Sequence, residues 1–212
     1  MADHAGTAGG SPAVPKARVH RGWHRRRYLP HFDVAGAVQM ITYRLADALP
    51  RHVASELSHS DDAKNRKRAE ALLDVGYGSC ILRRPQVARV VVENWHHFDA
   101  ERYRLLSWVV MPNHVHVLIE VIAGFSLSRI VHGWKSFTAK EIARHIRAPG
   151  TVWQEDYWDR AIRSEEHLAS AVAYIINNPV TAGLVDAPER WPWSSAANTH
   201  LSRSSRMPKA MR

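Results

Sequence analysis

Two histidines separated by a single residue are the side chains of this sequence best suited to hold a divalent cation. His114 and His116 lie in the run 108–120, where a Met-Pro-Asn turn signal separates two apolar stretches. This pattern predicts a strand, a tight turn and a second strand. Alternate residues of a strand share a face, so both imidazoles would point the same way and could supply two nitrogens to one ion. Open positions would remain for a substrate phosphate.

A helix over residues 165–177 would carry a second set of reactive groups. Ser164 suits the N-cap and two glutamates follow in the first turn. An apolar stripe then recurs at helical spacing through Leu168, Ala171, Val172, Ile175 and Ile176. Tyr174 and Asn178 lie off this stripe, within about 40° of each other on one flank. We expect Pro179 to end the helix, which would leave the Asn178 amide oxygen able to turn toward a metal.

Two imidazoles, one amide oxygen and a phenol form a mixed set of ligands and a possible nucleophile. Such a set suits magnesium or manganese functionally, although imidazole nitrogens would also accept zinc or another transition metal. A tyrosine with its ordinary pKa near 10 is a poor nucleophile at neutral pH. A metal would therefore have to polarise the scissile phosphate and favour the phenolate.

The composition favours one domain that binds a polyanion. The chain has 212 residues, with 29 Lys and Arg against 20 Asp and Glu, a formal charge of +9 and a pI near 10.1. Its single cysteine, Cys80, excludes an internal disulfide and a zinc site built from cysteines. Neither a signal peptide nor an apolar stretch of membrane-spanning length is evident, so we expect a cytoplasmic protein with no membrane partner.

The elements that must position these residues alternate between strands and helices. We expect a flexible basic arm over residues 1–30, one domain over 31–197 and a basic tail over 198–212. The predicted elements are a strand at 38–45, a helical insertion with a solvated basic face at 53–73, a helix at 85–98, paired strands at 103–110 and 114–121, a helix at 127–146, a short strand within 151–163 and the helix at 165–177. This order predicts an α+β, ferredoxin-like sandwich, with an antiparallel sheet and helices on one face.

Several segments resemble the IS200/IS605-like single-strand transposases and, within them, the REP-associated tyrosine transposases. The resemblance lies in residues 43–47, 108–120, 134–138, 153–163 and 174–185, and extends over about residues 31–197. It implies a Y1 transposase domain of the HUH type, in which His114 and His116 hold the ion, Asn178 completes the ligand set and Tyr174 attacks DNA. Many members of the larger group have Gln at the place of Asn178.

The implied function is a transposase and endonuclease that cleaves and rejoins single-stranded DNA at hairpin-forming repeats, with Mg²⁺ or Mn²⁺. Attack by Tyr174 would release a 3′-hydroxyl and keep a 5′-phosphotyrosine, which a second 3′-hydroxyl could attack to rejoin strands. The predicted partner is single-stranded or hairpin DNA, bound by a nucleoid-associated monomer or homodimer. The candidate backbone contacts are basic side chains: Arg25, Arg26, Arg27, Lys135, Arg160 and Arg163.

Two alternatives remain at the level of sequence. One is a binding module of the same fold that holds RNA or DNA hairpins while the histidines are merely structural. The other is a metal-dependent phosphodiesterase that uses activated water, with Tyr174 structural. A covalent protein–DNA adduct separates both from a tyrosine nucleophile, because neither forms one.

Overall fold

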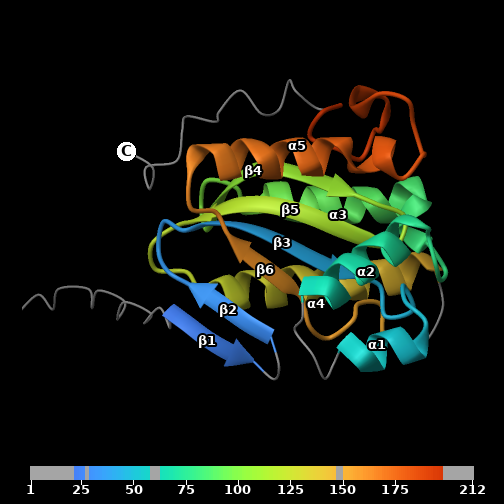
Figure 1. The fold of residues 1–212 in the computed structure, drawn as a ribbon, viewed down its shortest axis with the longest axis horizontal. Helices are drawn as coiled ribbons and strands as arrows, with labels where there is room; N and C mark the ends of the chain where they lie inside the picture. The colour runs from blue at the N-terminus through green and yellow to red at the C-terminus, as the bar shows by residue number, and fades with distance from the viewer. Residues whose placement is uncertain (1–21, 27–28, 58–62, 147–149, 198–212) are drawn as a thin grey trace, which may run out of the picture.

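A four-stranded antiparallel sheet forms the centre of the molecule in this computed structural model, which describes residues 22–26, 29–57, 63–146 and 150–197 (Figure 1). Its strand order is β4-β5-β3-β6, from β3 (Val38–Arg44), β4 (Tyr103–Val110), β5 (His114–Val121) and β6 (Trp158–Ala161). The helices are α1 (Arg51–Leu57), α2 (Ala63–Asp74), α3 (Pro85–His97), α4 (Leu127–Ile146) and α5 (Glu165–Thr181). Within the described residues no helix is both long and apolar enough to span a bilayer. The predicted α+β class and four-stranded antiparallel sheet are confirmed.

The alternation of side chains along each strand divides the core into two parts. Residues such as Ile41, Val117 and Ile119 face α3 and α4 and belong to the larger cluster of buried residues. The opposite face of the sheet forms a smaller cluster with α5: Val38, Met40, Val109, Met111, Leu118, Ile162, Ala171 and Ile175. Helices therefore cover both faces, and α5 lies opposite α3 and α4 (Figure 1).

The position of α5 corrects the prediction that all helices share one face. Its apolar stripe needs a surface to cover, and the face that carries His114 and His116 offers Met40, Val109 and Leu118. The larger cluster on the other face is already covered by α3 and α4. The helix that bears Tyr174 therefore lies on the same face as the two histidines.

Two predicted segments also differ from the structure. Residues 22–26, predicted within a flexible arm, form β1 (Gly22–Arg26), which pairs with β2 (Leu29–Asp33) in a separate antiparallel hairpin. The two strands pair through main-chain hydrogen bonds, so the basic side chains of this segment did not indicate a hairpin. The insertion at 53–73 contains two helices, α1 and α2. The basic tail 198–212 lies outside the described residues.

Pro179 lies inside α5, which continues to Thr181, so the prediction that the helix ends before this proline was wrong. Proline removes one backbone donor, but the last carbonyls of this helix still find partners. The Ala182 amide donates to the Asn178 carbonyl and the Leu184 amide donates to the Pro179 carbonyl, and each hydrogen bond is 2.9 Å long. The C-terminal turn is thereby completed, and it holds Asn178 within the helix instead of at its frayed end.

A buried hydroxyl links the helices to the sheet and provides a test of the fold. The Tyr103 hydroxyl accepts a hydrogen bond from Trp134 Nε1 over 3.0 Å and donates to the Trp95 carbonyl over 2.7 Å. Tyr103→Phe leaves both groups unpaired in the core, so we expect it to lower the free energy of unfolding by about 1–3 kcal/mol in urea titrations. The exposed Tyr77→Phe is the control and should change it by less than about 0.5 kcal/mol. Equal stability of the two variants would contradict this role.

Candidate active site

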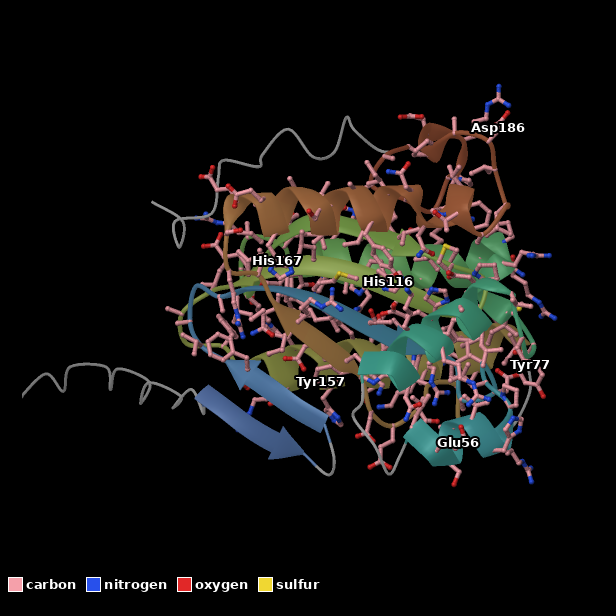
Figure 2. All side chains as sticks on the ribbon, viewed as in Figure 1. Glu56, Tyr77, His116, Tyr157, His167 and Asp186 are labelled. Carbon is pink, nitrogen blue, oxygen red and sulfur yellow. The ribbon has the colours of Figure 1, made fainter. Side chains whose placement is uncertain are left out.

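The two histidines lie side by side on β5, buried between the sheet and α5. Each is 1% exposed, and their Nε2 atoms are 3.1 Å apart. Figure 2 labels His116 at this position beneath α5. Antiparallel pairing of β5 with β3 places Arg44 opposite His114 and Thr42 opposite His116. The strand register therefore brings both imidazoles to one point on the sheet.

The Asn113 amide fixes the tautomer of His114. Asn113 Nδ2 donates to the Tyr77 carbonyl over 3.0 Å, so its Oδ1 is the atom that lies 2.8 Å from His114 Nδ1. Nδ1 must carry the proton to donate to this oxygen, and Nε2 of the neutral ring keeps its lone pair. The lone pair points toward His116, in the orientation that a metal-binding histidine needs.

Thr42 gives His116 a partner that can act in two ways. Its hydroxyl lies 2.7 Å from His116 Nδ1 and can either donate or accept. Without a cation, His116 Nε2–H can donate to His114 Nε2, while the hydroxyl donates to Nδ1. With both Nε2 lone pairs turned to a cation, Nδ1–H would instead donate to the hydroxyl. A threonine at this place therefore suits both states of the pair.

The spacing of the pair fits one shared cation. Two nitrogens each about 2.1 Å from one ion, at right angles, lie about 3.0 Å apart, close to the 3.1 Å between the Nε2 atoms. Burial lowers the pKa of His116 to about 3, and burial together with the neighbouring His116 lowers that of His114 well below its usual range. Both rings are therefore neutral at physiological pH and able to act as ligands.

Tyr174 and Asn178 complete the cluster from α5. The Tyr174 ring packs against the His116 ring, with centroids 5.2 Å apart and planes at 71°. Its side chain is 37% exposed, so the phenol that lies against His116 remains accessible from outside. Asn178 is 2% exposed, and its Oδ1 has no hydrogen-bond partner among the described residues. A buried amide oxygen without a donor is unfavourable, and a cation beside it would remove that penalty.

The environment of Tyr174 holds its phenol in the protonated form. Burial raises its pKa above the ordinary value, and the negative charges of Glu70 and Asp74 raise it further. The positive charge of Arg160 and a hydrogen bond from the Asn178 side chain act in the opposite direction. The described residues alone therefore disfavour a phenolate, and an added positive charge would be needed to favour it.

Glu70 and Asp74 were missed by the sequence analysis, which assigned their segment to a solvated basic face. Asp74 Oδ1 lies 4.0 Å from His114 Nε2, and burial, with the charge of Glu70, raises the pKa of this carboxyl to about 6. Glu70 lines a pocket of about 140 Å³ with Arg160 and Tyr174. The sequence contains one signal of this acidic side: Glu70 and Asp74 are four residues apart, so they share one side of an otherwise basic helix.

The predicted DNA-contact residues lie in different surroundings. Arg160 is exposed beside the Tyr174 pocket, and Arg163 is exposed after β6. The Lys135 ammonium instead donates to the carbonyls of Gln154 and Glu155, at a distance of 2.5 Å from each, and holds the loop before β6. Arg25 and Arg26 lie on β1, and Arg27 lies outside the described residues. A DNA contact stays a prediction for each.

The structure thus brings together His114, His116, Tyr174 and Asn178, as the sequence spacing predicted, while their roles stay predictions. In the part of the chain that the structure describes, no three His, Cys, Asp or Glu side chains alone form a group that could hold a metal. The predicted ligand set of two imidazoles and the Asn178 amide oxygen is not a group of this kind, and it stays a prediction. These groups offer a cation site next to a phenol that solvent can reach.

Part of this chain, which includes the residues of the site, is similar to known proteins. Residues 86–178 match the family model described as IS200-like transposase, a segment that includes the two histidines, Tyr174 and Asn178. An Escherichia coli K12 protein described as a REP-associated tyrosine transposase is 33% identical over 96 residues, which cover 44% of this chain and 54% of that protein. A Haemophilus influenzae relative is 28% identical over 104 residues and is covered over 58% of its length. The chain thus spans about half the length of these curated relatives.

A solved structure has the same fold. The structure of a REP-associated tyrosine transposase bound to a REP hairpin superposes with a TM-score of 0.52 at 18% identity, over 87% of each chain. At this identity the likeness shows the fold alone. Together with the family model and the sequence relatives, it confirms the resemblance predicted from the sequence.

The buried neutral histidines predict a dependence of stability on pH. The folded-state pKa of His116, about 3, lies below the ordinary value of 6.5, so the unfolded chain takes up this proton first as the pH falls. Below pH 6.5, His116 should lower the free energy of unfolding by up to about 1.4 kcal/mol per pH unit. Asp74, with its raised pKa, opposes this loss between about pH 6 and 4.

The His116→Gln variant isolates the contribution of His116. In EDTA, we expect its stability to fall less steeply than that of the wild type between pH 6.5 and 4.5, measured by urea unfolding at several pH values. Parallel curves for the two proteins would show that His116 does not remain neutral in the fold.

Proposed function

We propose that this protein is a metal-dependent single-strand DNA transposase that cleaves and rejoins DNA at hairpin-forming repeats through a 5′-phosphotyrosine. The observation that carries the proposal is the packing of the partly exposed Tyr174 ring against the His116 ring, at the edge of a histidine pair with the spacing of two metal ligands. A binding module would need neither this contact nor a buried Asn178 amide oxygen without a donor. The hairpin of the related structure suggests the class of DNA that this chain binds.

His114, His116 and Asn178 would hold the cation, because the two Nε2 atoms lie 3.1 Å apart and the buried Asn178 Oδ1 has no donor among the described residues. Nitrogen and oxygen donors of this kind suit Mg²⁺ or Mn²⁺. When bound, the cation supplies positive charge that polarises a phosphate and favours the phenolate. Asn113 and Thr42 would keep the rings oriented from the second nitrogen of each.

Tyr174 would be the nucleophile. Its oxygen forms a bond to the scissile phosphorus in line with the bond to the upstream 3′-oxygen, which breaks. The phenol proton leaves through solvent, and the 3′-oxygen takes up a proton to become a hydroxyl. The phosphodiester is conserved as a tyrosyl ester, so a second 3′-hydroxyl can attack it and rejoin strands without another energy source.

Basic residues around the site would hold the DNA backbone. Arg160 is exposed beside Tyr174 and already favours its phenolate by charge. Arg163 follows in the same connection to α5, and Arg25 and Arg26 lie on β1, with β2 next to β6. The net charge of +9 favours binding to a polyanion in general.

Removal of the phenol oxygen should abolish covalent chemistry. We expect Tyr174→Phe to form no protein–DNA adduct and to cleave DNA several orders of magnitude more slowly, because it lacks the oxygen that would attack the phosphate. DNA affinity should stay within about threefold, since it depends on phosphate contacts. The assay is incubation with 5′-labelled and 3′-labelled hairpin DNA and Mn²⁺, followed by a denaturing gel. The exposed Tyr77→Phe is the matched control, and persistent cleavage by Tyr174→Phe would disprove the nucleophile assignment.

Removal of the cation or of one ligand should have a similar effect on the chemistry. EDTA should suppress the adduct in the wild type, and added Mn²⁺ should restore it. His114→Ala should not respond to Mn²⁺, because it lacks one of the two buried nitrogens. Full adduct formation in EDTA would contradict metal dependence and leave the tyrosine chemistry intact.

A further inference from the structure

A carboxylate faces the histidine pair from a helix outside the segment that matches the family model. The matched segment begins at residue 86, whereas Asp74 is the last residue of α2. We propose that Asp74 is a further ligand of the cation, beside the two histidines and Asn178. This inference rests on the proposed function, because it concerns the same cation.

The distances between the donor atoms fit this assignment. Asp74 Oδ1 lies 4.0 Å from His114 Nε2, and His116 Nε2 lies 3.1 Å from the same nitrogen. Ligands about 2.1 Å from one ion are about 3.0 Å apart when adjacent and about 4.2 Å apart when opposite. The 3.1 Å between the two histidines thus matches adjacent ligands, and the 4.0 Å between Asp74 and His114 matches nearly opposite ligands. Oxygen donors are also what Mg²⁺ and Mn²⁺ prefer, and the histidines alone supply none.

Asp74 lacks a partner that would explain its position. Its Oδ1 is buried and has no hydrogen-bond donor among the described residues. Asp74 also ends its helix, where the backbone dipole disfavours a negative side chain. A cation at the histidine pair would compensate both of these unfavourable features.

The turn after α2 fixes Asp74 and His114 relative to each other. Gly78 has a φ of +89°, and a side chain there would clash with the Asp47 carbonyl. Within the same turn, the Tyr77 carbonyl accepts the hydrogen bond from Asn113 that orients His114. Tyr77, whose carbonyl sets the direction of the His114 lone pair, lies three positions after Asp74, so one turn positions both the carboxylate and the imidazole.

Glu70 provides a matched control one helical turn earlier. It lies on the same side of α2 and acts on Tyr174 by charge, as Asp74 does. It lines the pocket with Arg160 and His167 instead of facing the His114 nitrogen. A long-range charge effect would be shared by the two residues, whereas direct ligation would belong to Asp74 alone.

The test is calorimetric titration of the full-length protein with Mn²⁺ in the absence of DNA. We expect Asp74→Asn, which keeps the shape but removes the charge, to weaken Mn²⁺ binding by about tenfold or more. Glu70→Gln should weaken it by less than about threefold, because a screened charge farther from the ion contributes little. Circular dichroism verifies that each variant is folded, and Asp74→Ser replaces Asp74→Asn if that variant does not fold.

The outcomes separate this inference from the proposed function. Equal Mn²⁺ affinities of wild type and Asp74→Asn, or equal losses in Asp74→Asn and Glu70→Gln, would overturn the ligand assignment. A wild type that binds Mn²⁺ through Asp74 but forms no DNA adduct would refute the proposed chemistry and support the ligand assignment. A wild type that does not bind Mn²⁺ would overturn the assignment outright.

Discussion

The register of β5 against β3 is the constraint on which the rest of the site depends. In a strand, every second side chain shares a face, so Val115, Val117 and Ile119 enter the larger core only if His114 and His116 face the other way. A shift by one residue would turn both imidazoles toward α3 and α4 and the valines toward α5. The burial of apolar side chains on one face therefore holds the histidines on the other. The same register places Thr42 opposite His116, so that the hydroxyl that orients this ring also depends on it.

The position of the candidate nucleophile depends on packing in a similar way. Ile175 is fully buried in the smaller cluster between α5 and the sheet, and Ala171 packs one turn earlier. These contacts set the rotation of α5, so that Tyr174, on the adjoining flank of the helix, packs against His116, and Asn178 hydrogen-bonds to Tyr174. The Asn178 amide is held by a completed helical turn around Pro179. The apolar packing between α5 and the sheet thus brings the reactive side chains of α5 close to the histidines of β5, although the two elements are far apart in sequence.

Much of this could be predicted from the sequence, and the parts that could not have physical reasons. The strands 103–110 and 114–121 were predicted with the bounds that the structure has, because alternation and the turn before His114 are local signals. The start of α5 followed from the Ser164 cap, whose hydroxyl accepts from the His167 amide. The face that α5 covers was predicted wrongly, because the sequence shows that a helix has an apolar stripe but does not show which surface covers it. The role of α2 was missed for the same reason, since its basic residues dominate the local pattern while Asp74 points inward only in the folded chain.

The electrostatic features of the site all favour an added positive charge. Burial keeps His114 and His116 neutral, leaves the oxygens of Asn178 and Asp74 without donors, and raises the pKa of Tyr174. Each of these features is unfavourable or inactive by itself, because a buried oxygen without a donor costs free energy and a protonated phenol is a poor nucleophile. A single positive charge would relieve them together: it would pair with the oxygens, use the imidazole lone pairs and favour the phenolate. A fold built only to bind nucleic acid would gain nothing from gathering these groups, since a polyanion requires donors and positive charge on the surface that it contacts. The arrangement is therefore better explained by a cation that acts with Tyr174 than by structural histidines.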